Sequence, residues 1–204
     1  MWMASRWSQS LLRDALCVYG NKAKMPTMRW ANTWFVLWFV GATMALLVLL
    51  HDSPLKLAIW LGWLANLGLL GLVDARTGLL PNELTLAMML SGLGFHAWLA
   101  QAWLPPTAYL WGMCLGWAVP YALNALHRRL RSSMAIGEGD AKLLAGIGAW
   151  LGAQALPLTW VLACLGVLVY TACLWAVGQR RPTYVVFGPF LAMGASATLF
   201  MSYV

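Results

Sequence analysis

Residues 55–73 read LKLAIWLGWLANLGLLGLV, a run of nineteen residues with one charged side chain, Lys56. A helix of about 20 apolar residues crosses the ~30 Å hydrocarbon core of a bilayer. Comparable runs recur along the chain, and we expect seven spans, at 33–50, 55–73, 83–103, 107–127, 141–156, 158–178 and 184–203. The expected fold is therefore all-α, a polytopic membrane bundle of seven helices.

The composition supports this fold class and excludes others. Of the 204 residues, 62% are hydrophobic and only 9% are charged, whereas soluble domains carry about 25% charged residues. Disorder is excluded because it requires low hydrophobicity. The net charge of +7 comes from short stretches between apolar runs rather than from a basic face. We therefore expect lipids as partners and no nucleic acid.

The basic residues also predict the orientation of the chain. With a cytoplasmic N-terminus and seven spans, Lys56 is the one basic residue outside, and twelve lie inside: Arg6, Arg13, Lys22, Lys24, Arg29, Arg76, Arg128, Arg129, Arg131, Lys142, Arg180 and Arg181. Cytoplasmic loops are the ones enriched in Lys and Arg. We expect residues 1–32 to form a basic cytoplasmic segment, a candidate interfacial helix, and residues 33–204 to form the transmembrane domain.

Two of the six carboxylates stand where an apolar run meets the cytoplasmic side. Asp74 directly follows the run that ends at Val73, and Asp140 stands at the start of a helix. An ionisable side chain at the membrane boundary is a candidate functional group. Two carboxylates in a partly dry site cannot both ionise easily, so the pair would share a proton and could activate water. Alternatively, Asp140 is a first-turn helix charge, and Asp74 pairs with Arg76.

The residues around Asp140 have two interpretations each. Gly137 and Gly139 lack side chains, which suits an extended substrate backbone beside Asp140 but equally suits a flexible loop. Glu138 either raises the pKa of Asp140 or points to water. Lys142 either pairs with a carboxylate or extends to the lipid headgroups. The histidines and cysteines share no ligand motif, so no metal is expected.

Three ordered motifs resemble the type IV prepilin peptidase family, the membrane aspartic proteases with a G-x-G-D motif. The first is DARTGLLPN at 74–82, in which an aspartate ends a helix and a proline, Pro81, follows after a short loop. The second is GEGDAKLL at 137–144, and the third is FGPFLA at 187–192. The resemblance covers about residues 55–203, so that a six-helix catalytic core would follow one N-terminal helix.

The resemblance implies a bacterial inner-membrane enzyme that removes the basic leader from type IV prepilins or pilin-like proteins at the cytoplasmic face. Asp74 and Asp140 would be the catalytic pair, the loop at Pro81 would help shape the site, and no cofactor is implied. Larger members carry two C-x-x-C pairs near the N-terminus, associated with metal binding and N-methylation. None of the four cysteines here forms such a pair, so we do not expect methyltransferase activity.

The same two aspartates would also suit a different class of protein, a small proton-coupled transporter. In that case Asp74 and Asp140 would form a proton relay. Transporters usually place such carboxylates near the bilayer midplane and show internal repeats. Here the two aspartates stand at the membrane boundary, and no repeat is evident, so the peptidase is the favoured hypothesis.

Overall fold

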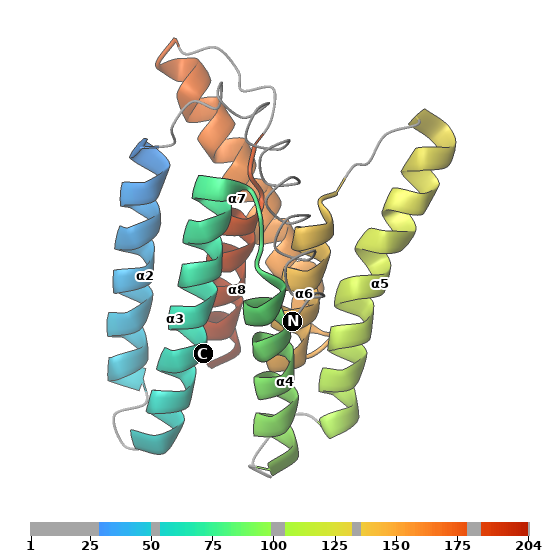
Figure 1. Cartoon of the computed structure of the whole chain (residues 1–204). Helices are drawn as coiled ribbons and strands as arrows, with labels where there is room; N and C mark the ends of the chain where they lie inside the picture. The colour runs from blue at the N-terminus through green and yellow to red at the C-terminus, as the bar shows by residue number, and fades with distance from the viewer. Residues whose placement is uncertain (1–28, 50–53, 99–104, 132–135, 179–184, 204) are drawn as a thin grey trace, which may run out of the picture.

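The computed structural model describes residues 29–49, 54–98, 105–131, 136–178 and 185–203. Within these ranges the chain forms seven α-helices and no strand, which confirms the all-α expectation (Figure 1). Their bounds are α2 Arg29–Leu49, α3 Pro54–Thr77, α4 Asn82–Trp98, α5 Pro106–Arg131, α6 Glu138–Leu151, α7 Ala155–Ala176 and α8 Gly188–Tyr203. The predicted interfacial helix in residues 1–32 lies outside the described residues, except that 29–32 begin α2.

The break between α6 and α7 differs from the expected one. The span expected at 141–156 ends as a helix at Leu151, and the turn lies at Gly152 rather than around Pro157. Gly152 has a φ of 82°, which favours glycine, and its N–H donates to the carbonyl of Gly148. Pro157 falls in the first turn of α7, where a missing N–H costs no helical hydrogen bond. The expectation of a turn at the proline was therefore wrong.

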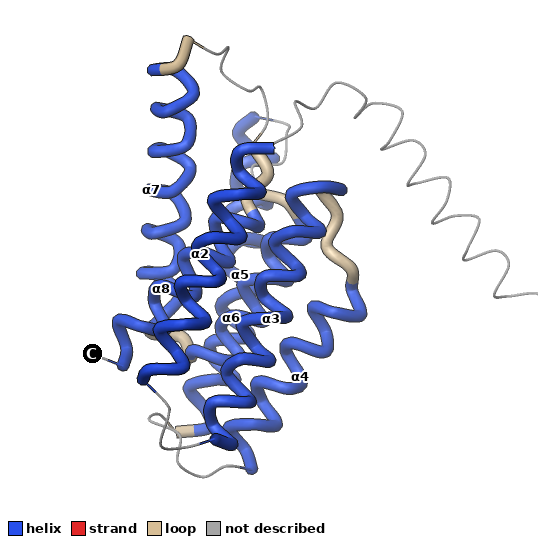
Figure 2. The backbone as a smooth tube through the Cα atoms, turned by 90° about the vertical axis from the view of Figure 1, so that its left-hand side faces the viewer, coloured by secondary structure: helices blue, strands red, loops and turns tan. Residues whose placement is uncertain are grey.

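The helices run alternately up and down, so distant motifs reach one end of the bundle. The C-terminal end of α3 and the N-terminal ends of α6 and α8 lie toward the top of Figure 1. In the view turned by 90°, α7 extends beyond the other helices at this end (Figure 2). The three motifs at 74–82, 137–144 and 187–192 are therefore carried to the same end of the molecule.

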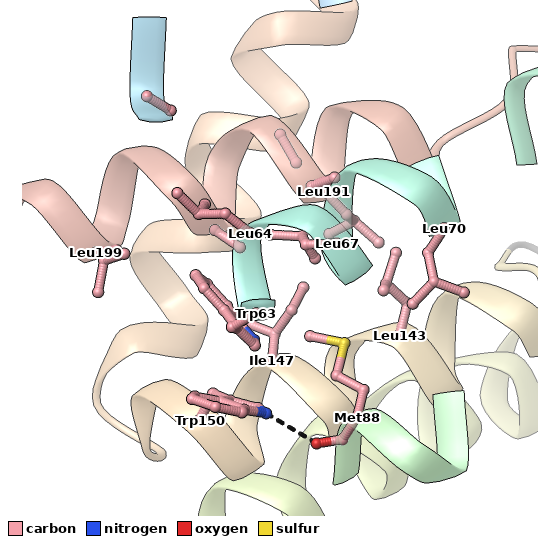
Figure 3. Close-up of a cluster of buried hydrophobic side chains, with 14 of the residues drawn as sticks. Trp63, Leu64, Leu67, Leu70, Met88, Leu143, Ile147, Trp150, Leu191 and Leu199 are labelled. Carbon is pink, nitrogen blue, oxygen red and sulfur yellow. Dashed lines mark hydrogen bonds between the residues drawn. The ribbon is translucent and has the colours of Figure 1, made fainter. Parts of the chain in front are cut away.

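Helix α6 forms the centre of the bundle. It packs against α4, α5, α7 and α8, and its residues 143–150 are all buried. Figure 3 shows Leu143 and Ile147 meeting side chains from α3 and α8, and the indole N–H of Trp150 donating to the carbonyl of Met88 on α4 at 2.8 Å. With 14 residues, α6 is only ~21 Å long. It is a short helix enclosed by longer ones.

Glycines allow α5 and α6 to touch backbone to backbone. A Cβ atom at Gly112 would overlap the carbonyl oxygen of Gly148, and one at Gly116 would overlap that of Leu144. The sequence pairs Gly112/Gly116 and Gly148/Gly152 indicate such an approach, since small residues four apart let helices come close. The contact fixes α5 against the helix that carries Asp140.

Two of the described helices are long and apolar enough to cross a membrane, Pro54–Thr77 and Ala155–Ala176. In α7 only 11% of the most apolar window is buried inside the protein. Exposed side chains on α7 include Val161, Leu165, Leu168 and Val169. Such an apolar outer surface is what a helix facing lipid presents.

Candidate active site

Asp74 lies three residues before the end of α3 and is 5% exposed. The helix ends at Thr77. The next residue, Gly78, has a φ of 60°, in the left-handed region, and its N–H donates to the carbonyl of Asp74 at 2.7 Å. This is the αL capping arrangement that glycine favours just after a helix. The glycine of the first motif thus ends α3 one turn after the aspartate.

A negative charge at the C-terminal end of α3 is disfavoured by the dipole of that helix. The structure supplies a compensating contact, because the backbone N–H of Gly188 donates to Oδ2 of Asp74 at 3.0 Å. Gly188 is the first residue of α8, and the N–H groups at a helix N-terminus attract anions. A Cβ atom at Gly188 would overlap the Asp74 carboxylate, so this contact requires glycine.

Asp140 lies in the first turn of α6, just before the segment expected to span the membrane. Gly137 is the N-cap residue, and its backbone N–H donates to the Asp140 carboxylate. A carboxylate three residues after the N-cap that bonds back to the N-cap N–H forms half of a capping box. The other half, a side chain at the N-cap, is missing because residue 137 is glycine.

The environment of Asp140 raises its pKa to about 7. Burial contributes most because it penalises the charged carboxylate, and the negative charge of Asp74 adds to the effect. The hydrogen bond from Gly137 acts in the opposite direction. The charge of Asp74 therefore acts on Asp140. With a pKa of about 7, Asp140 is partly protonated at neutral pH, and an acid–base reaction on a peptide bond requires such a proton.

The two motif loops contact each other next to this pair. A Cβ atom at Gly139 would lie 3.0 Å from Cδ1 of Leu80, so Leu80 occupies the open side of that glycine. A Cβ atom at Gly137 would meet only the Asp140 side chain, 3.0 Å from Oδ2, and Gly137 is exposed. Gly139 thus serves packing between the loops, while Gly137 leaves one side of Asp140 uncovered.

Pro81 and Lys142 hold the start of α4 in place. The carbonyl of Pro81 accepts a hydrogen bond from the N–H of Thr85 at 3.2 Å, which opens α4. The ammonium of Lys142 donates to Oδ1 of Asn82 at 2.7 Å. Lys142 thus contacts an amide of the first motif, which neither interpretation from the sequence included. Glu138 is exposed, in agreement with the interpretation that it points to water.

Two residues at this site are absent from the candidates chosen by sequence. Gly188 belongs to the third motif, so the motif itself could have marked it as a partner of Asp74. Asn124 of α5 is buried and bonds both backbone groups of Ile136, just before Gly137. The available signal for Asn124 was an amide among the apolar residues of α5, just before the basic stretch that begins at His127.

Comparison with known proteins decides the family. A family model described as the type IV leader peptidase family matches residues 58–172, more than half of the chain. The chain belongs to the type IV leader peptidase family. This confirms the resemblance drawn from the motifs. The matched region contains Asp74 and Asp140 and ends before Gly188.

Relatives of this family member include several proteins named prepilin leader peptidase/N-methyltransferase. One from Burkholderia pseudomallei (strain 1026b) is 39% identical over 140 residues, which are 68% of this chain and 45% of the relative. One from Escherichia coli (strain K12) is 35% identical over 130 residues, 64% of this chain and 57% of the relative. The chain thus spans about half the length of the curated relatives it matches. No solved structure matches it.

Proposed function

We propose that this chain is a membrane aspartic endopeptidase that removes the basic leader from type IV prepilins or pilin-like proteins. The proposal depends above all on one observation: Asp74 and Asp140, from two distant motifs, are electrostatically coupled at one end of the bundle. Membership of the type IV leader peptidase family and the names of the relatives support the same substrate class. Metal and cofactor play no part in the proposed reaction.

The proposed reaction uses the proton of Asp140, whose pKa of about 7 leaves it partly protonated near neutral pH. The N–H of Gly188 favours a negative charge on Asp74, and burial favours the protonated form of Asp140. Asp74 then takes a proton from water, and the water oxygen attacks the carbonyl carbon of the scissile peptide. Asp140 donates its proton to the carbonyl oxygen. The tetrahedral intermediate, which carries two hydroxyl groups, collapses as the leaving nitrogen receives the proton from Asp74 and Asp140 takes back a proton from one hydroxyl. The C–N bond breaks, an acid and an amine are released, and both aspartates return to their starting protonation.

We further propose that the chain crosses the bacterial inner membrane with the seven spans expected from its sequence and with a cytoplasmic N-terminus, so that Asp140 lies just before the span at 141–156. The distribution of basic residues supports this orientation, since Lys56 alone would face outward. The same orientation puts the ends of α3 and α6 at the cytoplasmic face, where a leader made in the cytoplasm is accessible. A reporter fused after Arg131 should report cytoplasm, and one fused at Pro105 should report periplasm; the reverse result would refute the orientation.

The exposed carboxylates beside the pair suit a positively charged leader. Glu83 is in the first turn of α4 and Glu138 opens α6, and both are exposed. Opposite charges across an interface steer binding and fix register. The apolar segment that follows the leader would then remain in the bilayer. We do not extend the proposal to N-methylation, because the four cysteines form no C-x-x-C pair.

The test is co-expression with a type IV prepilin, scored by the size of the processed product. Asp74→Asn and Asp140→Asn should each abolish leader removal, since an amide can neither accept nor donate the required proton. Asp52→Asn is the matched control, because Asp52 precedes the first residue of α3, Pro54, in the sequence, whereas Asp74 is near its last residue. Cleavage that survives both single substitutions would refute the catalytic pair.

The transporter hypothesis gains no support from the fold. Asp74 and Asp140 lie at the ends of their helices rather than at mid-length, whereas carboxylates that relay protons through transporters lie near the midplane. Proton-driven flux in vesicles without prepilin cleavage would nevertheless refute the peptidase proposal.

A further inference from the structure

A buried amide on α5 holds the backbone immediately before the second motif. Asn124 is 6% exposed. Its Nδ2 donates to the carbonyl of Ile136 at 2.7 Å, and its Oδ1 accepts the N–H of Ile136 at 2.8 Å. A side-chain amide that bonds both backbone groups of one residue fixes the orientation of that residue as well as its position.

The held carbonyl belongs to the same peptide group as the donor that reaches Asp140. The C=O of Ile136 and the N–H of Gly137 lie in one planar unit, so they cannot rotate independently. The N–H of Gly137 donates to the Asp140 carboxylate. A hydrogen bond accepted by the carbonyl also polarises the peptide group and strengthens its N–H as a donor. Asn124 is therefore linked to Asp140 through a single rigid group.

We propose that Asn124 is a positioning residue for Asp140, because its amide orients the Ile136–Gly137 peptide so that the N–H of Gly137 meets the carboxylate. The inference deepens the proposed function, since the catalytic importance of Asp140 rests on it. Gly137 has no side chain to cap α6, and no side-chain cap bond is present there. The orientation of this peptide group thus depends on a contact from another helix.

At the end of the bundle where Asp140 lies, helices α3 to α6 carry charged or titratable side chains. Asp74 and Arg76 come from α3, Glu83 from α4, His127, Arg128 and Arg129 from α5, and Glu138 and Lys142 from α6 itself. Helices α7 and α8 carry no charged side chain. Burial, and after it the charge of Asp74, raises the pKa of Asp140, and the Gly137 N–H opposes both. Weakening that N–H contact should therefore raise the pKa further.

The test measures the titration of Asp140 directly in the purified, detergent-solubilised protein. A water-soluble carbodiimide reacts with protonated carboxyls, and mass spectrometry of the Asp140 peptide gives the extent of reaction at each pH. In Asn124→Leu the midpoint should move up by about one pH unit, the equivalent of losing one hydrogen bond to a charged group. The alkaline limb of prepilin cleavage should move in the same direction, and the maximal rate should fall roughly tenfold.

Two further variants separate positioning from a general loss of structure. Thr159→Val removes another fully buried side-chain hydrogen bond, to Thr198 at 3.1 Å. Thr198 lies ~15 Å along α8 from Gly188, so this control should leave the midpoint unchanged. Asn124→Ser replaces Asn124→Leu if the leucine variant does not fold. The serine side chain is too short to reach both backbone groups of Ile136, so the midpoint should move in the same direction.

The outcomes distinguish this inference from the proposed function. An unchanged midpoint in a folded Asn124 variant, with a wild type that cleaves prepilin, refutes the positioning role alone. A shifted midpoint in a protein that never cleaves prepilin supports the positioning role and refutes the proposed function.

Discussion

Replacing Asp140 by asparagine should stabilise the protein at alkaline pH although it removes activity. The pKa of Asp140 is about 7 in the folded protein, against 3.8 for a free carboxyl. The folded state therefore binds the proton more tightly than the unfolded state. The contribution of Asp140 to stability is greatest below the pKa of the unfolded state. It falls as the pH rises from that pKa to the pKa of the folded state, and it is constant above the latter. Asparagine keeps the shape of the side chain and avoids the charge.

The size of the effect follows from the difference between the pKa of Asp140 in the folded and in the unfolded state. Each pKa unit corresponds to ~1.4 kcal/mol, so ionised Asp140 costs the folded state up to about 4 kcal/mol at slightly alkaline pH. The variant should thus match the wild type near pH ~4 and exceed it by an amount approaching this limit above pH ~7. Solvent reaching the partly buried carboxyl makes the figure an upper limit.

The assay is unfolding of both proteins in mixed detergent micelles, followed by tryptophan fluorescence across this pH range. The difference in free energy of unfolding between variant and wild type cancels the contribution of every titratable group that the two proteins share. Glu138→Gln is the control, because it makes the same kind of change at an exposed carboxyl in the same helical turn. A stability difference that stays constant with pH would show that neither burial nor Asp74 acts on Asp140, and the reasoning would fail.

Two glycine substitutions should separate the site from the scaffold. Gly188→Ala would place a methyl group against the Asp74 carboxylate and should lower the cleavage rate roughly ten- to a hundredfold. Its control is Gly62→Ala, which has open space around it and should leave the rate unchanged. Equal rates for the two variants would refute the role of the Gly188 contact. Gly112→Ala would overlap a backbone carbonyl of α6 and should cost about 1–3 kcal/mol in a detergent unfolding assay. Gly94→Ala meets nothing and should gain up to ~1 kcal/mol, so the opposite order would contradict the packing.

Much of the helical architecture could be predicted from hydrophobicity, because apolar runs of about 20 residues fit few structures other than a membrane-spanning helix. The expected span 55–73 lies within α3, and 107–127 lies within α5. The prediction failed at the α6–α7 junction, where a proline suggested the turn. A proline fits the first turn of a helix, while the positive φ of Gly152 is set by packing that periodicity does not record.

The candidate pair could be located by sequence because charged residues are rare in this chain and their cost in an apolar setting is high. The contacts that arrange the pair could not be predicted in the same way. The bond from Gly188 to Asp74 joins residues 114 positions apart. The two hydrogen bonds between Asn124 and Ile136 depend on how α5 is rotated about its axis. Backbone donors leave no trace in side-chain composition, so only the folded chain reveals them.

The backbone contact between α5 and α6 has a mechanical consequence for the whole assembly. Gly112 touches α6 near one end of α5 and Asn124 holds Ile136 near the other, twelve residues and ~18 Å apart along the helix. α5 is therefore held against the segment that carries Asp140 at two places, with Pro120 inside the helix between them. A substitution that moves α5 at Gly112 is therefore expected to disturb the contact at Ile136 as well, and with it the peptide beside Asp140.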